Sequence, residues 1–195
     1  MTMSPLVKKL AFAILARPRL AAALLKIGFN YYPAIRRTGC KVSQISTDVR
    51  QITVKLPLNW KTRNLNGSLF GGSMFAATDP FYMSMLYFNL GEEYVVWDKG
   101  GTIRFKRPAL STLTAEFRLD EAELTEIHQL LAITPEITRT YAVAMVNAKG
   151  DVCAEVDRVL YIAHKSAYDA KQLERRQRLA QAASGAATST SSTPN

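Results

Sequence analysis

Two glycines and one carboxylate are the residues in this chain best suited to catalysis. Gly71 and Gly72 open an apolar segment in which Asp79 is the only charged residue before Leu90. Glycines at the start of a helix let a ligand approach the backbone, and the free N–H groups of the first turn can stabilise an oxyanion. A carboxylate can act as a general base or a nucleophile. We therefore predict that Gly71, Gly72 and Asp79 are catalytic.

Each of these residues also has a purely structural interpretation. Gly71 and Gly72 would permit tight packing between a helix and a sheet. Asp79 precedes Pro80, and an Asp cap followed by Pro at the first helical position is a familiar helix start. Asn64, just upstream, would by default be a loop or turn residue. From the residues alone, both interpretations stay open.

The elements around these residues predict a helix enclosed by an antiparallel sheet. The segment Phe70–Leu90 is apolar on every face, which predicts one buried helix with a kink at Pro80. Alternating or apolar segments predict five strands, at 45–58, 94–106, 112–119, 137–147 and 152–163. A short helix capped by Asp120 is expected at 120–131, and a hairpin turn at Lys149–Asp151.

Several residues of this region resemble the motif of the hotdog thioesterases. Asn64, Gly67, Gly71, Gly72 and Asp79 match its spacing. The later segment Ile103–Ala109, which ends in Arg-Pro-Ala, matches the strand that follows the family's helix. The likeness covers roughly Ile45–Ala163. It is similar to the phenylacetate-pathway acyl-CoA thioesterases, and most of all to a bacterial branch of hotdog proteins without a settled function.

This resemblance implies an α+β hotdog fold and an assembly of at least two subunits, a homodimer or homotetramer, with the active site between them. The amide of Gly71 or Gly72 would polarise the carbonyl of an acyl-CoA or related thioester. Asp79, from the partner subunit, would activate water or attack directly. The substrate-binding residues predicted with them are Asn64, Phe70, Lys99, Arg63 and Arg107.

Phe70 departs from the motif, which has histidine at this position. A phenylalanine can pack an acyl chain but cannot donate a hydrogen bond or carry a proton. Two alternatives to a thioesterase therefore remain open. One is a non-catalytic acyl or lipid binder, and the other is an acyl-thioester dehydratase or hydratase, although neither His128 nor His164 is well placed for that reaction.

The net charge of +9 is concentrated at the ends of the chain. Residues 1–41 contain eight basic side chains and no acidic one, whereas the central region is close to neutral. This excludes a nucleic-acid-binding core and suits terminal helices that either cap the domain or contact an anionic membrane. We expect four regions: a helical extension at 1–41, the hotdog domain at 42–164, a helix at 165–183 and a disordered tail at 184–195.

The chain contains few cysteine and histidine residues, which limits the disulfides and metal sites that it could form. Cys40 and Cys153 lie far apart, and with only two histidines the chain offers no zinc site of the usual type. We therefore expect no metal and no cofactor, and a reduced, cytoplasmic protein.

Overall fold

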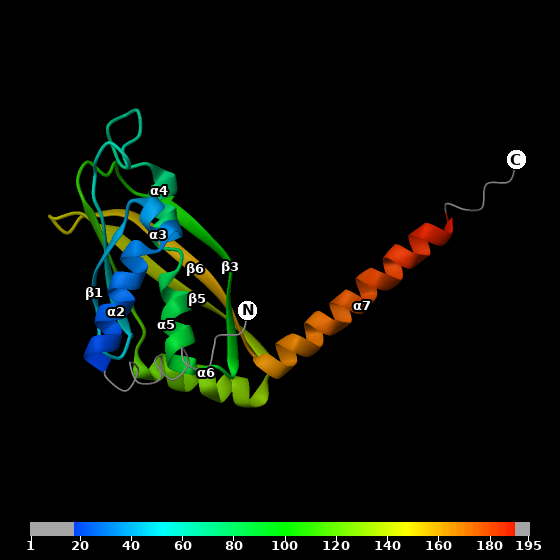
Figure 1. The fold of residues 1–195 in the computed structure, drawn as a ribbon. Helices are drawn as coiled ribbons and strands as arrows, with labels where there is room; N and C mark the ends of the chain where they lie inside the picture. The colour runs from blue at the N-terminus through cyan, green and yellow to red at the C-terminus, as the bar shows by residue number, and fades with distance from the viewer. Residues whose placement is uncertain (1–17, 190–195) are drawn as a thin grey trace, which may run out of the picture.

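The computed structural model describes the backbone of residues 18–189 and the side chains as far as Gln181. The first part of the predicted helical extension, residues 1–17, and the last residues of the tail, 190–195, lie outside the described residues. Within them, a six-stranded antiparallel sheet curls around a central helix, as the sequence predicts (Figure 1). The order of the strands is β1-β2-β4-β5-β6-β3, so β1 and β3 form the two edges.

The sheet has six strands, in agreement with the expected minimum of five, and the additional strand lies at its start. The strands are β1 (Lys41–Ile45), β2 (Gln51–Leu56), β3 (Tyr94–Phe105), β4 (Leu113–Arg118), β5 (Glu136–Val146) and β6 (Val152–His164). The single strand expected at 45–58 is therefore wrong at its start, where β1 and β2 form a hairpin. Its turn is built by Ser46, whose Oγ accepts hydrogen bonds from the backbone N–H groups of Arg50 and Gln51.

The central apolar segment forms two helices and not one kinked helix. α4 (Gly71–Ala76) and α5 (Phe81–Leu90) are separated by the four residues 77–80. Pro80 explains the break, because a proline disfavours helical geometry in the residue before it and has no N–H to donate. α5 is the buried core helix, with the side chains of Phe81, Met85 and Leu86 inaccessible to solvent.

Burial of α5 is not complete in a single chain. Tyr87 and Phe88 are exposed near its C-terminal end, although the sequence predicts a helix buried on all sides. The reason is that the sheet covers one side of α5 and the N-terminal helices flank it, which leaves part of its surface open (Figure 1).

Helices at both ends of the chain flank this core. α2 (Pro18–Tyr31) packs on β1, where the side chain of Asn30 exchanges two hydrogen bonds of 3.0 Å with the backbone of Val42. α3 (Pro33–Thr38) follows after a break at Tyr32. α6 (Glu121–Ile133) is capped by Asp120 as predicted. α7 (Lys165–Ser189) extends away from the domain and continues beyond the predicted end at 183, because its alanine-rich sequence favours helix (Figure 1).

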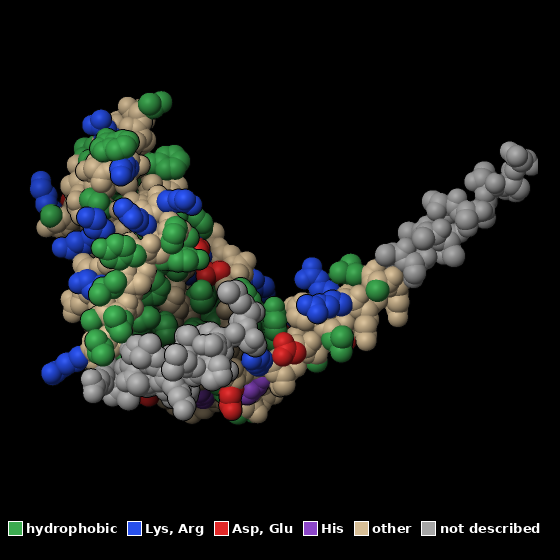
Figure 2. Space-filling model, viewed as in Figure 1, with side chains coloured by type: hydrophobic (Ala, Val, Ile, Leu, Met, Phe, Trp, Pro, Cys, Tyr) green, Lys and Arg blue, Asp and Glu red, His purple; other side chains and the backbone are tan. Residues whose placement is uncertain are grey.

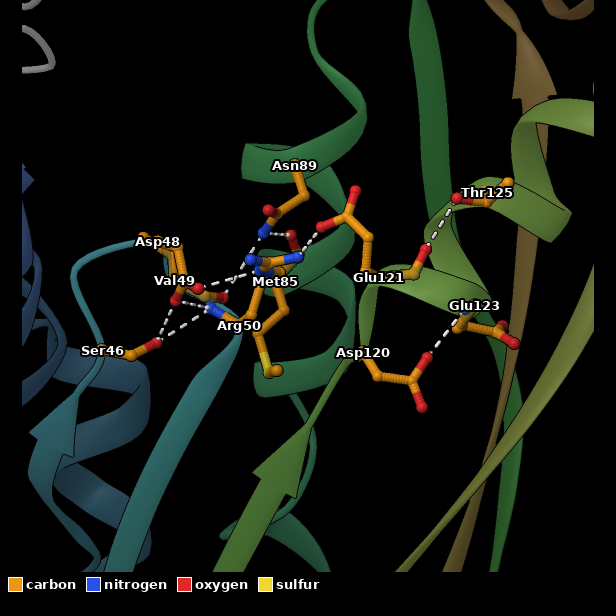
Figure 3. Close-up of polar contacts among 10 residues, drawn as sticks. All are labelled: Ser46, Asp48, Val49, Arg50, Met85, Asn89, Asp120, Glu121, Glu123 and Thr125. Atoms are coloured by element: carbon orange, nitrogen blue, oxygen red, sulfur yellow. Dashed lines mark hydrogen bonds and ion pairs between the residues drawn. The ribbon is translucent and has the colours of Figure 1, made fainter.

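The turn between β1 and β2 ties the end of α5 to the start of α6 (Figure 3). The Arg50 guanidinium pairs with Asp48, at 2.9 Å, and with Glu121 of α6. Asn89 of α5 donates a hydrogen bond to the carbonyl of Val49, which has a positive φ of 57°. These contacts fix the C-terminal end of α5, and its N-terminal end lies toward α4 (Figure 1).

Candidate functional site

The motif residues at the start of α4 form one wall of a cavity of about 450 Å³. Asn64 and Gly71 lie on one side of this cavity, and Phe105 and Arg107 lie on the other. A hydrogen bond of 2.9 Å from the Leu69 amide to the Ala109 carbonyl joins the two segments. The structure therefore brings together the two stretches of sequence that carry the resemblance.

Asn64 shapes the loop that leads into this cavity. Its Oδ1 accepts hydrogen bonds from the amides of Asn66 and Ser68, at 2.9 and 3.1 Å, and its Nδ2 donates to the Ser68 hydroxyl at 2.9 Å. These bonds agree with the loop interpretation of Asn64. Because the residue also lines the cavity, it holds the cavity wall in place.

The two glycines are each covered by an aromatic ring. A Cβ atom built on Gly71 would lie 2.7 Å from the Phe105 ring, and one on Gly72 would lie 2.4 Å from the Phe70 ring. A side chain at either position would therefore require the neighbouring ring to move. Both rings are more than half exposed, so they form the surface of the site and not part of the core.

The three predicted cationic substrate-binding residues differ in position. Arg107 lines the cavity and pairs with Asp151 at 2.9 Å, so its charge is partly neutralised. Arg63 is exposed and forms an isolated bridge with Leu69, outside the cavity wall. Lys99 is exposed, at a register shift between β3 and β6, and does not line the cavity.

Asp79 forms an ion pair with a buried arginine that the sequence analysis missed. The Nη2 group of Arg158, on β6, donates hydrogen bonds to Asp79 and to Asp98 of β3, the latter at 2.7 Å. The Arg158 side chain is only 4% exposed, whereas the Asp79 side chain is 59% exposed. The expectation that Asp79 is surrounded by apolar groups is therefore wrong for the single chain.

The capping interpretation of Asp79 is also wrong. The residue at the N-cap of α5 is Pro80, and no side chain accepts a hydrogen bond from the first turn of this helix. The carboxylate of Asp79 instead points to Arg158, on the other side of the α4–α5 turn. Its position is therefore set by an ion pair with the sheet.

The residues around Arg158 leave space for its guanidinium and pack against it. Phe75 of α4 lies over it, with 5.2 Å between the Arg158 Cζ atom and the ring centroid. Gly101 of β3 leaves room beside it, because a Cβ there would come within 3.3 Å of Nη1 and 2.9 Å of the Asp157 carbonyl. Among the described residues, the buried Nε of Arg158 has no hydrogen-bond partner.

A signal for Arg158 is present in the sequence. β6 alternates, and Ala154, Val156, Leu160 and Ile162 all point into the core with Arg158 at the same phase. An arginine on an otherwise apolar inward face needs a buried partner, because an unpaired buried charge is costly. This pattern predicts a buried carboxylate nearby, although it does not say which one.

The two carboxylates bound to Arg158 differ in environment. Burial raises the pKa of Asp98, and the Arg158 guanidinium offsets this only in part. Asp79 is open to solvent and is fixed in orientation by the same guanidinium. Such a pair can hold a water molecule beside an oriented carboxylate, which is the requirement for general-base catalysis. No group of three or more metal-binding side chains occurs among the described residues.

The cavity and the Asp79 cluster do not meet within one chain. They lie at opposite ends of α4, whose six residues span roughly 9 Å at 1.5 Å per residue. The grouping of Gly71, Gly72 and Asp79 as one centre is therefore not found in a single subunit.

Comparisons with known proteins identify the fold. Residues 21–162 match the model of a family described as a domain of unknown function, DUF4442. PA5026 from Pseudomonas aeruginosa, named a probable thioesterase, has a TM-score of 0.65 and 18% identity over 73% of this chain and 95% of its own. No curated protein matches the sequence.

Two further solved structures, one of them named a thioesterase, have the same architecture. HI1161 from Haemophilus influenzae has a TM-score of 0.55 and 16% identity, over 73% of this chain and 90% of its own. The PaaI protein of the E. coli phenylacetic acid degradation operon has a TM-score of 0.51 and 15% identity, over 77% and 95%. The hotdog fold predicted from the sequence is thereby confirmed.

Proposed function

The chain belongs to the DUF4442 family and has the hotdog fold, and on this basis we propose that it is a thioesterase acting on acyl-CoA or a related acyl thioester. The observation that carries the proposal is the exposed carboxylate of Asp79, oriented by the buried guanidinium of Arg158. An oriented, solvent-accessible carboxylate is what activation of water requires.

The complete site forms between two subunits in this proposal. β3 is a twelve-residue strand at the edge of the sheet, with Trp97 and Phe105 exposed along it. A long open edge of this kind is prone to aggregation unless it is paired. Pairing β3 with its counterpart in a second copy satisfies the edge and can bring Asp79 of one subunit toward Gly71 of the other.

The reaction is hydrolysis. Asp79 takes a proton from water as the water oxygen attacks the thioester carbonyl. The developing oxyanion accepts a hydrogen bond from the Gly71 or Gly72 amide, and collapse of the intermediate expels the thiolate of coenzyme A. The thiolate takes up the proton held by Asp79, so the products are a carboxylic acid and a free thiol. Arg158 keeps Asp79 in place, and Arg107 and Asn64 line the entrance for the substrate.

Binding of an acyl group without hydrolysis is the second candidate. Phe70 cannot supply the hydrogen bond of the motif histidine. An apolar cavity of about 750 Å³ between α2 and α5, lined by side chains such as Leu24, Phe29, Met83 and Phe88, is large enough for an acyl chain. A binder that retains the fold would use this cavity.

A dehydratase or hydratase is disfavoured by the positions of the histidines. His128 lies beside Tyr94, 3.4 Å from its hydroxyl, and His164 contacts the Leu131 carbonyl at 3.0 Å. His128 is part of α6 and His164 ends β6, and Figure 2 shows the histidine side chains at one end of the molecule. Neither ring reaches the Arg158 cluster, so no imidazole is available there among the described residues.

The test is a panel of acyl-CoAs from short to long, with free thiol release as the readout. A thioesterase releases thiol from at least one acyl class, and mass spectrometry of the purified protein reports any fatty acid that it retains. Retained fatty acid without thiol release across the whole panel would favour the binder.

Assembly is tested separately by light scattering. The proposal requires a mass of at least twice the 21.7 kDa of the chain. A mass of one chain at micromolar concentration would remove the intersubunit site and with it this mechanism.

A further inference from the structure

A cleft of about 1020 Å³ lies between the N-terminal helices and the first two strands, and none of its lining residues belongs to the Asp79 cluster. Five of its lining residues are cationic, and none is acidic. The cationic residues are Lys26, Arg36, Lys41, Lys55 and Lys61. All five are exposed, and none of them pairs with a carboxylate among the described residues. The cleft therefore carries a concentrated, uncompensated positive charge.

Two of these lysines lie directly opposite each other. Lys41 of β1 is the antiparallel partner of Lys55 on β2. Like charges in this position destabilise a sheet. A lysine on an edge strand such as β1 can prevent aggregation, but β2 is paired on both sides, so this explanation does not cover Lys55. The pair is better explained by a ligand with negative charge.

An exposed apolar row runs along α2 beside this cleft. Leu20, Leu24, Ile27 and Tyr31 follow the spacing i, i+4, i+7 and i+11, which places them on one face of the helix. Ile27 is 53% exposed and Tyr31 is 71% exposed. The opposite face, with Ala21 and Ala22 buried, already packs on the domain. The outer row thus has no role in the core.

Exposed aromatic side chains surround the row and the cleft. Tyr31 lines the cleft, Tyr32 follows it, and Trp60 is 79% exposed, with the Lys61 ammonium 5.1 Å from its ring centroid. Tyrosine and tryptophan favour the headgroup layer of a membrane, where one end of the ring system is apolar and the other is hydrated. Figure 2 shows basic and hydrophobic side chains gathered together over this side of the molecule.

We propose that α2, α3 and the basic cleft form a docking face for the surface of an anionic phospholipid bilayer. Lys26, Lys41 and Lys55 meet lipid phosphates, while the outer row of α2 enters the headgroup layer. The contact is peripheral, since no helix of the described chain is long and apolar enough to cross a membrane. A nucleic acid or an acidic protein would match the cations but not the row from Leu20 to Ile27. This inference does not depend on the thioesterase proposal.

The charge contribution is tested by vesicle sedimentation with the full chain. Vesicles containing phosphatidylglycerol are compared with vesicles of phosphatidylcholine alone, and the protein is expected to bind the first much more tightly. A basic residue near an anionic surface contributes about a factor of five, so Lys41→Gln/Lys55→Gln should weaken binding about 25-fold. The matched control, Arg175→Gln/Arg176→Gln on α7, removes the same charge from two exposed residues and should leave binding unchanged.

The apolar contribution is tested with Ile27→Gln, which keeps a good helix former at an exposed position. Ile27 is about half exposed, so contact with the bilayer would bury the exposed half of its side chain. We therefore expect the substitution to weaken vesicle binding about fivefold. Leu173→Gln on α7, where the leucine is also more than half exposed, is the control. Circular dichroism and thermal melting confirm that each variant is folded, and the Lys41/Lys55 variant should melt no lower than the parent.

Three results would overturn the proposal. The first is no preference for anionic vesicles. The second is an equal loss of binding in the α7 controls. The third is normal vesicle binding by the Lys41/Lys55 and Ile27 variants. Binding of DNA or an acidic peptide without vesicle binding would assign the cleft to a soluble polyanion and also reject the bilayer.

Discussion

Replacement of Asp79 by asparagine separates the catalytic role of this residue from its structural one. The ion pair between Asp79 and Arg158 joins a buried cation to a carboxylate that is 59% exposed. Solvent screening limits the contribution of such a pair to about 1 kcal/mol or less. Asparagine keeps the size of the side chain and an oxygen that can accept a hydrogen bond from Arg158. We therefore expect the free energy of unfolding to change by less than about 1 kcal/mol.

The effect on the reaction should be far larger. Asparagine cannot take a proton from water, and loss of a general base lowers turnover by about 10² to 10⁴-fold. A factor of 10² corresponds to roughly 2.7 kcal/mol in the activation barrier. The assay is thiol release from the best acyl-CoA of the panel, with urea unfolding measured on the same preparation.

Asp98→Asn is the matched control, because it makes the same substitution on the other carboxylate bound to Arg158. Asparagine keeps an oxygen that can accept the hydrogen bond from Arg158, and Asp79 remains paired with the same guanidinium, so the variant should fold normally. We expect turnover to fall by less than about tenfold. If Asp79→Asn retains activity close to that of the parent, the reasoning about Asp79 is wrong. If Asp98→Asn loses as much activity, the reacting carboxylate is Asp98.

Two further predictions concern stability. Arg158→Met should lower the free energy of unfolding by about 3 kcal/mol, because it leaves the partly buried Asp98 without its cation; an unchanged urea midpoint would contradict this. The hydrogen bond from Ser46, together with the Arg50 backbone, lowers the pKa of Asp48 to about 2. This lowered pKa means that ionised Asp48 stabilises the folded protein above about pH 4, and that the stabilisation is lost as the pH falls toward 2. Because Asp48 is nearly half exposed, we expect a difference of about 1 kcal/mol, seen as a flatter decline of melting temperature with acid in Asp48→Asn.

Local signals allowed much of the fold to be predicted. Asp120 predicts the start of α6, and its side chain does accept a hydrogen bond from the Glu123 amide. Gly150 predicts the β5–β6 turn, where its φ is 85°. These predictions succeeded because each depends on a few neighbouring residues. β1 was missed because it has only five residues, among which Val42 is the only buried one.

The candidate site depends on contacts between distant segments, and these were harder to predict. Arg158 and Asp79 are separated by 79 residues, and the register of β3 with β6, which pairs Asp98 with Leu160, is needed to bring Asp98 near Arg158. The break at Pro80 also mattered, since a continuous helix would have directed Asp79 elsewhere. Sequence motifs identified Gly71 and Asp79 together, but in the described chain the two residues lie at opposite ends of α4.

Phe70 offers the sharpest test between hydrolysis and binding. Its ring is 56% exposed and lies against Gly72, so a smaller imidazole fits there without burying a polar group. In the family that the chain resembles, a histidine at this position helps to fix the thioester. If the protein is a thioesterase that works without this histidine, Phe70→His should raise turnover by about tenfold, somewhat less than the loss on removing an oxyanion-binding donor. Thiol release measures this, and Phe70→Leu, which is apolar and also smaller, is the control. Equal activity of the parent and a normally folded Phe70→His variant would show that the thioester carbonyl does not lie beside residue 70. The acyl group would then be expected in the apolar cavity between α2 and α5.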